Sequence, residues 1–306
     1  MSSGRDRSPA SADGWVECRC GSRHWGRSGA AGLLLTDGAR VVLQHRAEWS
    51  HQGGTWGLPG GARHIEESAV AGALREATEE AGVDASRVRP FATSVLTHPD
   101  WSYTTVLART QADLPVSATD DESLEVRWVP LEQVSDRPLL PAFEDAWPLL
   151  RTMLDVDPHV IVDAANVVGS LPDGWWRDRR GATARLIRRI DPLAAVGVPA
   201  GFADLPGEHW WPTWHVVTEG AARGARTTAR GAGTTARGAG TTATSAVEII
   251  EAPGSGDDAI AALAGSLDKA GASVIVTTAD RELQRRCEHA TIATPGQLLA
   301  LLDAFP

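Results

Sequence analysis

The segment from residue 61 to 83, GARHIEESAVAGALREATEEAGV, constrains the fold of this chain more than any other. Its central part is rich in Ala and Leu, contains no Pro, and ends at Gly82, which suits the position just after a helix. In a helix, Glu76, Glu79 and Glu80 are spaced i, i+3 and i+4, so their carboxylates share one face. Carboxylates gathered this closely repel one another unless a cation lies among them, and Mg²⁺ and Mn²⁺ prefer oxygen ligands. The segment therefore predicts a helix that binds a divalent cation, in preference to a solvated acidic face.

The spacing resembles the signature of the Nudix hydrolases, Gly-x5-Glu-x7-Arg-Glu-U-x-Glu-Glu-x-Gly-U, where U is aliphatic. Every fixed position is met from Gly61 onward, and Ala77 and Val83 fill the two U positions. The resemblance implies that the three glutamates hold the metal, that Arg75 orients their carboxylates, and that Glu67 supports the loop before the helix. It also implies metal-assisted attack of water on phosphorus in a nucleoside diphosphate linked to another group X.

The resemblance further implies a Nudix α/β/α sandwich with a mixed sheet over residues 29–154. A hairpin is expected at Asp37-Gly38, because these residues suit the positive φ angles of a tight turn. A helix is expected over residues 142–154, with a kink or restart at Pro148. The apolar runs that predict strands are residues 30–35, 40–44, 88–96, 103–109 and 124–129.

Five residues of this half are candidates for substrate contacts. Arg46 ends a predicted strand, where Nudix proteins often place a phosphate-binding arginine; a surface arginine is the alternative. Gly60 and Gly61 belong to the Trp-Gly-Leu-Pro-Gly-Gly stretch that leads into the helix, and Gly61 permits its tight start. Trp101 and Tyr103 could stack on a base, or could be ordinary strand aromatics.

Glu122 precedes the last predicted strand, and the resemblance implies that a glutamate in such a loop serves as metal ligand or general base. Together with Asp120 and Asp121 it is otherwise part of an ordinary solvated acidic loop.

The sequence gives little information about the choice of substrate. Pro99 lies where ADP-ribose pyrophosphatases of the superfamily often have proline, whereas the Trp-Gly-Leu-Pro-Gly-Gly stretch resembles MutT-like enzymes that act on nucleoside triphosphates.

Length and charge limit the remaining function classes. At 306 residues, with 42% hydrophobic residues, the chain is long enough for two domains with ordinary cores. A formal net charge of −10 argues against general affinity for nucleic-acid backbones, although a local basic groove stays open. No apolar run reaches membrane-spanning length and the N-terminus lacks a signal-peptide core, so we expect a cytoplasmic protein with no membrane partner.

Residues 1–28 are expected to form a polar tail that carries Cys18, Cys20 and His24. These three side chains could supply zinc ligands, but no fourth ligand is evident nearby. Reduced, partly buried thiols are the alternative. Three cysteines in the whole chain do not suggest a disulfide framework.

The second half, residues 159–306, predicts another α/β domain after a linker at residues 155–158. Short apolar strands are expected from residue 159 to 163 and over residues 214–218, 247–250 and 272–278. Acidic residues follow these strands, at the edge where parallel sheets bind ligands; helix caps are the alternative role.

Three dispersed motifs of this half resemble the NYN branch of PIN-like nucleases: Val-Asp163-Ala-Ala-Asn166, Gly-Asp257-Asp258-Ala-Ile and Val-Thr-Thr-Ala-Asp280-Arg-Glu-Leu. The resemblance implies a Rossmann-like three-layer domain with a mostly parallel sheet that cleaves RNA with Mg²⁺ or Mn²⁺. It implies Asp163, Asp257 and Asp280 as metal ligands, with Asn166 assisting. Weaker candidates are Asp178, Glu219 and Asp258.

Residues 221–246 are expected to be a flexible insertion in the second domain. They contain three near-identical seven-residue units that begin at Arg223, Arg230 and Arg237. The units are rich in Gly, Thr and Ala, cannot bury a core, and lack the apolar positions of a coiled coil. Their arginines, with no acids among them, could contact RNA.

The chain is thus predicted to be an Mg²⁺-dependent pyrophosphohydrolase of nucleoside triphosphates or nucleoside diphosphate-X compounds, fused to a metal-dependent RNase-like domain. The alternative is a nucleotide-sensing Nudix module that regulates the attached nuclease without much turnover. The complete set of three glutamates favours catalysis, because a pure sensor does not need all of them.

Overall fold

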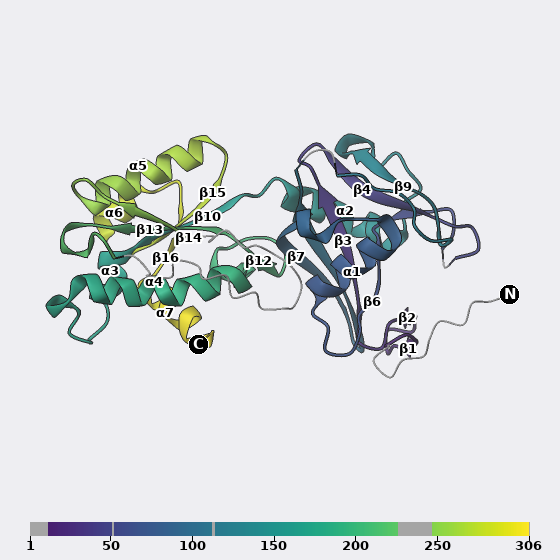
Figure 1. The fold of residues 1–306 in the computed structure, drawn as a ribbon, viewed down its shortest axis with the longest axis horizontal. Helices are drawn as coiled ribbons and strands as arrows, with labels where there is room; N and C mark the ends of the chain where they lie inside the picture. Colours follow the sequence, from purple (N-terminus) through teal and green to yellow (C-terminus); the bar gives the residue numbers. More distant parts are fainter. Residues whose placement is uncertain (1–11, 51, 112–113, 226–246, 306) are drawn as a thin grey trace. The chain divides into compact units, whose positions relative to one another are not determined.

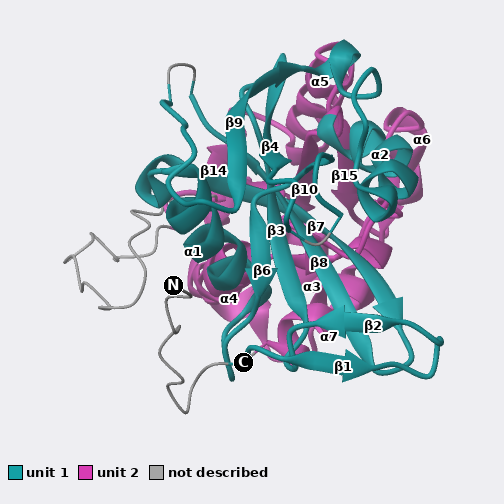
Figure 2. Cartoon of the chain, turned by 90° about the vertical axis from the view of Figure 1, so that its right-hand side faces the viewer, with its two compact units in different colours: residues 1–154 teal, residues 155–306 magenta. Residues whose placement is uncertain are grey.

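A computed structural model describes residues 12–50, 52–111, 114–225 and 247–305 (Figure 1). Contacts along the chain divide it into two compact units, residues 1–154 and 155–306, which are coloured separately in Figure 2. Each unit has its own sheet and its own helices, and each is described by itself below.

The first unit contains a mixed sheet, as predicted. Its strands follow the order β7-β8-β3-β4-β5, with β6 beside β3 and β9 beside β4. Strand β3 is parallel to β8 and antiparallel to β4 and β6, and all of its residues are buried, so it is the centre of the unit. The strands are β3 (Ala30–Thr36), β4 (Arg40–Arg46), β5 (Trp56–Gly57), β6 (Gly60–Ala62), β7 (Arg89–His98), β8 (Trp101–Arg109) and β9 (Ser123–Pro130).

The five strands predicted for this half are all present, with ends that differ by at most two residues. The two short strands β5 and β6 were not predicted, because two or three residues are too few to show an alternating pattern. Helix α2 (Pro141–Leu154) also matches the predicted helix, and Pro148 lies inside it.

Helix α1 (Ala69–Ala81) is the predicted acidic helix. The Ser68 side chain accepts a hydrogen bond from the Ala71 N–H at its start, and Gly82 ends it with a φ of 65°, which confirms the predicted left-handed residue. The face next to Glu76 and Glu80 carries Ala73, Ala77 and Ala81, which are all fully buried in the core of the unit. Small side chains on this face let the helix lie close to β3.

Residues 15–25 are not a tail, and the expectation of a polar tail up to residue 28 is wrong for them. They form an antiparallel hairpin of β1 (Trp15–Glu17) and β2 (Arg23–Trp25). The Trp15 and Trp25 rings meet edge to face across it, with centroids 5.3 Å apart. Cross-strand aromatic pairs of this kind stabilise a hairpin, which explains why a polar stretch becomes ordered.

The second unit contains a sheet in the order β14-β13-β10-β15-β16 in which every pairing is parallel. The chain therefore adds strands on one side of β10 and then returns to add strands on the other. Such a reversal of strand order opens a crevice at the carboxyl ends of the central strands. The strands are β10 (Pro158–Asp163), β13 (Thr213–Thr218), β14 (Val247–Glu251), β15 (Ser273–Thr277) and β16 (Thr291–Ala293).

Helices cover both faces of this sheet, so the unit has three layers. Figure 1 shows α5 and α6 on one face and α3, α4 and α7 on the other. In this unit β11 (Val198–Pro199) and β12 (His209–Trp210) form an antiparallel pair. The helices are α3 (Ala164–Gly169), α4 (Arg179–Val196), α5 (Gly256–Lys269), α6 (Arg281–Arg286) and α7 (Pro295–Ala304).

The predicted repeat insertion at residues 221–246 lies largely outside the described residues, which resume at Val247. A short 3₁₀ turn at Gly220–Ala222 precedes it. Within the described ranges, no helix combines the length and the apolar character needed to cross a bilayer.

Two glycines that are close in sequence give a prediction about the first unit. A Cβ on Gly60 would lie 2.5 Å from the Ala31 carbonyl oxygen and 2.5 Å from Gly32 Cα, and backbone atoms cannot rotate away. A Cβ on Gly57 would meet only the Leu140 side chain, at 3.7 Å. We expect Gly60→Ala to lower the free energy of unfolding by about 2–3 kcal/mol and Gly57→Ala by less than about 1 kcal/mol.

The measurement is chemical denaturation of both variants beside the wild type. Equal destabilisation by the two substitutions would contradict the close approach of β6 to β3.

Candidate active site

Arg75 organises the acidic end of α1. Its guanidinium donates two hydrogen bonds to the Glu67 carboxylate, both of 3.0 Å, and one of 2.7 Å to Glu76 Oε1. It also donates to Glu79 Oε2 at 3.3 Å and to the Ala62 carbonyl oxygen at 2.9 Å. The hydrogen bonds to Glu67 and Glu76 and their negative charges raise the pKa of Arg75 further above its ordinary value. One cation thus fixes three carboxylates and the end of β6.

Glu67 connects this network to the loop before the helix. Its carboxylate accepts a hydrogen bond from the His64 N–H at 2.9 Å as well as those from Arg75. These hydrogen bonds, led by that of Arg75, lower the pKa of Glu67. A Cβ on Gly72 would lie 3.1 Å from Glu67 Oε2, so the carboxylate is packed directly on the helix. The geometry agrees with the supporting role implied for Glu67.

Glu80 is the buried carboxyl group of the cluster, with only 9% of its surface exposed. It accepts a hydrogen bond from the Gly60 N–H at 2.9 Å. Burial, with smaller contributions from the negative charges of Glu76, Asp120 and Glu122, raises the pKa of Glu80 to about 8, against the effect of that hydrogen bond. The sequence named Glu122 as a candidate, and the structure brings it and Asp120 into the electrostatic surroundings of Glu80.

The glycines of β6 allow its backbone to pass close to these carboxylates. A Cβ on Gly61 would lie 2.8 Å from the carboxyl carbon and both oxygens of Glu76. On the neighbouring strand, a Cβ on Gly32 would overlap the Tyr103 hydroxyl. Glycine at these positions therefore leaves room for the functional side chains, whereas the sequence suggested only that Gly61 permits a tight start to the helix.

Arg46, Tyr103 and Glu122 come to the same end of the sheet. Arg46 ends β4 and pairs with Ser123 of β9, and the Ala47 N–H donates to the Glu122 carbonyl oxygen at 2.8 Å. Burial raises the pKa of Tyr103, and the charges of Glu80 and Arg46 act on its hydroxyl in opposite directions. A cation, a phenol and carboxylates thus lie around one region between α1 and the sheet.

Trp101 is the first residue of β8 and has partners of its own. Its ring stacks on His24 with centroids 4.4 Å apart and planes 11° apart, and its Nε1 donates to the Trp25 carbonyl oxygen at 3.0 Å. The Tyr103 ring centroid lies 6.2 Å away. The hairpin β1–β2 therefore covers one face of Trp101, which sequence reasoning had considered for stacking on a base.

The carboxylate oxygens of Glu80 and its neighbours suit a hard divalent cation, because these are the ligands that Mg²⁺ and Mn²⁺ prefer. The carboxylates of Glu76 and Glu80 are largely buried, whereas the Glu79 side chain is 60% exposed. A cation among them would offset the mutual repulsion that contributes to the raised pKa of Glu80. Glu76, Glu79 and Glu80 are the residues that would hold it.

Comparisons with known proteins agree with this geometry. The family model described as NUDIX domain matches residues 26–153. A protein of Mycobacterium tuberculosis described as putative 8-oxo-dGTP diphosphatase 3 is 50% identical over 153 residues, which cover 46% of this chain and 69% of that protein. The chain belongs to the Nudix family. The resemblance found in residues 61–83 is thereby confirmed.

Two further relatives share part of this chain. A nucleoside triphosphate pyrophosphatase/Nudix hydrolase fusion protein of Bifidobacterium longum is 45% identical over 152 residues, or 47% of this chain. The chain spans about a third of that protein, since the match covers 32% of it. The crystal structure of a Nudix hydrolase from M. smegmatis is 45% identical, with a TM-score of 0.43, over 46% of this chain and 94% of that chain.

A second acidic group lies in the other unit, outside the matched Nudix domain. A cavity of about 470 Å³ opens at the carboxyl ends of β10 and β13. The predicted residues Asp163, Asp257 and Asp280 line it together with Asn166 and Glu219. The three dispersed motifs of the second half thus meet at one place. The other two weaker candidates do not line it: Asp178 caps α4 at Gly181 N–H, and Asp258 pairs with Arg286 at 2.8 Å.

Asp163 is the buried member of this group. Its carboxylate accepts hydrogen bonds from the Asn166 N–H at 3.0 Å and from Thr278 Oγ1 at 2.9 Å. Burial nevertheless raises the pKa of Asp163, with smaller contributions from Asp257 and Glu219. Sequence reasoning missed Thr278, whose only signal was its place two residues before Asp280.

Asp257 and its neighbours complete the cavity. Burial raises the pKa of Asp257, and the charges of Asp280 and Glu219 add to the effect. Asp280 accepts hydrogen bonds from two N–H groups at the start of α6, and Glu219 Oε2 accepts one from Gly256 N–H at 2.6 Å. These carboxylates therefore also cap or brace the helices, as the alternative role of N-caps allowed.

The raised pKa of Glu80 gives a prediction about pH. In metal-free protein the folded state keeps a proton on Glu80 up to about pH 8, whereas the unfolded chain releases it near the ordinary value of 4.5. The folded state therefore binds more protons in this window, and its stability falls as pH rises from about 4.5 to about 8. Glu80 alone contributes at most about 1.4 kcal/mol for each pH unit.

We expect Glu80→Gln to flatten the loss of stability over this window in the presence of a chelator. The readout is the free energy of unfolding at several pH values, for wild type and variant. Glu79→Gln is the control, because its exposed carboxylate is not forced into a buried site. A Glu80→Gln profile parallel to that of the wild type would show that burial of Glu80 carries no such linkage.

Proposed function

We propose that the Nudix domain is a pyrophosphohydrolase that cleaves a pyrophosphate bond in a nucleoside triphosphate or nucleoside diphosphate-X substrate with Mg²⁺ or Mn²⁺. The observation that carries the proposal is the set of carboxylates that Arg75 and the β6 backbone hold around the buried Glu80. Such a set is costly for a fold that only needs stability, because like charges repel in a buried place. Binding of a catalytic cation explains why these carboxylates are kept together despite that cost.

Each residue of the site has a role in this proposal. Glu76, Glu79 and Glu80 hold the cation, and Arg75 keeps the first two oriented. A bound divalent cation neutralises charge on the phosphate oxygens and favours attack of water at phosphorus. Glu122 is the proposed acceptor of the proton of that water, and the effect of its charge on the pKa of Glu80 supports this role.

Arg46 is proposed to bind a phosphate of the substrate. It lies at the end of β4 beside the Glu122 backbone, and its positive charge acts on the Tyr103 hydroxyl. An arginine fork suits the oxygens of a phosphate chain. We propose that the Gly60 and Gly61 backbone contacts the phosphates in the same region; the absence of side chains there lets the strand lie against Gly32 and the Glu76 carboxylate.

A purine nucleoside triphosphate is the proposed substrate class. The 50% identical relative of M. tuberculosis is described as a putative 8-oxo-dGTP diphosphatase 3, which supports triphosphates over ADP-ribose. Pro99, the one residue that favoured ADP-ribose, lies in the turn between β7 and β8, where its carbonyl oxygen accepts a hydrogen bond from Arg19 at 3.2 Å. We propose Tyr103 as a ring that contacts the base, with Trp101 beside it.

A panel of nucleotides tests the proposal. We expect wild-type protein with Mg²⁺ to release phosphate or pyrophosphate from nucleoside triphosphates, and Glu79→Gln and Glu80→Gln each to lower kcat by about 10²–10³-fold, or about 3–4 kcal/mol. Glu125→Gln, on β9 beside Arg127, is the control and should retain activity.

Two outcomes would count against this assignment. Turnover that persists in both glutamine variants would remove the proposed metal ligands. Nucleotide binding without turnover in any of the proteins would favour the alternative, a sensing module that regulates the attached domain.

We further propose a second activity, the metal-dependent cleavage of RNA by the unit of residues 155–306. The specific observation behind it is that acidic residues from three separated motifs line one cavity at the strand ends. Carboxylates with raised pKa values suit a divalent cation, and Asp163, Asp257 and Asp280 are the residues that would hold it. A bound cation would activate water for attack on a phosphodiester.

Cleavage of a labelled single-stranded RNA with Mg²⁺ tests this second activity. We expect Asp163→Asn and Asp257→Asn to lower the rate by at least about 10²-fold while nucleotide hydrolysis persists. Asp257 is the cleaner position, because Asp163 also caps α3. Asp268→Asn, exposed on α5, is the control. Equal RNA cleavage by wild type and both aspartate variants would remove the nuclease assignment.

A further inference from the structure

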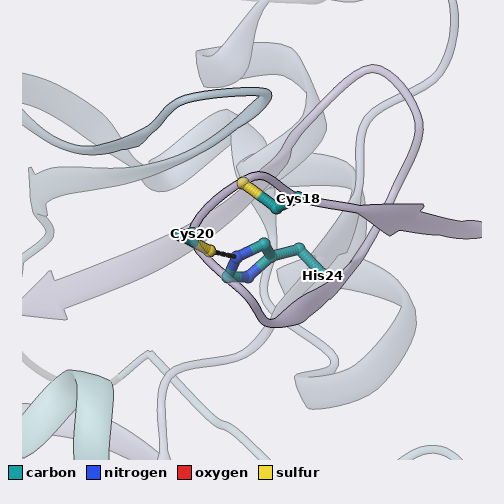
Figure 3. Close-up of side chains that lie close together, drawn as sticks. All are labelled: Cys18, Cys20 and His24. Carbon is teal, nitrogen blue, oxygen red and sulfur yellow. Dashed lines mark hydrogen bonds between the residues drawn. The ribbon is translucent and has the colours of Figure 1, made fainter.

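A third group of ligand-type side chains lies in the hairpin β1–β2, apart from both acidic sites. One donor atom each from Cys18, Cys20 and His24 lies within 4.8 Å of the other two, the only such trio among the described residues. Figure 3 shows the Cys20 sulfur next to the His24 ring, and the Sγ to Nε2 distance is 3.2 Å. The group thus consists of two thiols and one imidazole.

The spacing of these atoms suits a single tetrahedral ion. Zinc binds thiolate sulfur at about 2.3 Å and imidazole nitrogen at about 2.0–2.1 Å. Two tetrahedral sulfur ligands then lie about 3.8 Å apart, and sulfur and nitrogen about 3.5 Å apart. The Cys20 Sγ to His24 Nε2 distance of 3.2 Å is slightly shorter than the sulfur–nitrogen value, and all three ligand atoms lie within 4.8 Å of one another. An ion would therefore require only small movements of the side chains.

The hairpin itself brings the ligands together. Cys18 N–H donates to the Ser22 carbonyl oxygen at 3.0 Å, and Gly21 N–H donates to the Cys18 carbonyl oxygen at 2.9 Å. Gly21 has a φ of 88°, which closes the turn and suits glycine. Pairing of Val16 with His24 then places the imidazole on the returning strand, beside the thiols. The site is therefore built by the backbone before any ion binds.

We propose that Cys18, Cys20 and His24 form a Zn²⁺ site with three protein ligands, separate from the Nudix metal site. Two sulfurs and one nitrogen match zinc, whereas the all-carboxylate sites match Mg²⁺ or Mn²⁺. Cys18 is buried and Cys20 is exposed. Three protein ligands would leave the fourth position of a tetrahedral zinc ion for water or another small ligand.

The ion fixes the hairpin on the Nudix sheet. The His24 ring stacks on Trp101 and lies 4.3 Å from the His98 ring, centroid to centroid. Arg19, between the two cysteines, forms an ion pair with Asp100 at 2.8 Å. Zinc that orients His24 therefore also orients Trp101, the aromatic side chain beside Tyr103. Binding of zinc would therefore affect the position of the aromatic side chains that we propose to lie beside the substrate base.

Cobalt binding to the full-length protein tests the site. Protein is reduced, stripped with a chelator and titrated with Co²⁺, whose thiolate complexes show a charge-transfer band that carboxylate complexes lack. We expect a band that saturates at about one Co²⁺ per chain, disappears when Zn²⁺ is added and persists in excess Mg²⁺.

Three variants make the test specific. Cys20→Ala, at an exposed position, should weaken the band and lower Co²⁺ affinity at least about 10-fold. Cys287→Ala is the matched control, because it also removes one cysteine but from the other unit, and it should leave the titration unchanged. His24→Ala should lower affinity while the thiolate band remains.

The outcomes that overturn the proposal are equally clear. If reduced wild-type protein shows no charge-transfer band, the site is excluded, because reduction has already removed any disulfide between Cys18 and Cys20. An unchanged titration of Cys20→Ala would place the metal elsewhere. An unchanged affinity of His24→Ala would show that the imidazole is not a ligand and would overturn the three-ligand set.

Discussion

The guanidinium of Arg75 is the interaction on which the Nudix site depends. Four carboxylates that would otherwise repel one another lie beside α1, and Arg75 contacts three of them while it also binds the Ala62 carbonyl oxygen. The fourth, Glu80, receives its hydrogen bond from the backbone of the same short strand, at Gly60. Helix α1 and strand β6 are therefore joined through charged side chains. The alanines of α1 supply the apolar contacts with the core.

The parts of the structure that follow from local spacing could be predicted from the sequence. The helix, its left-handed Gly82, the strands around it and the shared face of the glutamates all depend on residues close together in the chain. In the second unit, Asp163 and Asp280 could be placed together because carboxyl ends of parallel strands share one edge of a sheet.

The rest depends on contacts between distant segments, which spacing does not encode. Whether Glu122 acts on Glu80 is set by the register of β9 on β4, and only the family resemblance, not the acidic loop itself, distinguished Glu122 from Asp120. The sequence allowed Trp101 to stack on a base. In the structure the hairpin β1–β2, which lies in the expected tail, covers one face of its ring. That hairpin escaped prediction because its order comes from tryptophan pairing and a three-residue ladder, not from an apolar pattern.

The two close approaches at the centre of the Nudix sheet have different consequences for sequence change. Every amino acid other than glycine carries a Cβ. At Gly32 that atom would meet the end of a side chain, the Tyr103 hydroxyl, so a smaller residue at 103 would relieve most of the overlap. At Gly60 it would meet only main-chain atoms, which every residue possesses. A residue larger than glycine at position 32 therefore requires a smaller residue at position 103, whereas no partner substitution can release position 60.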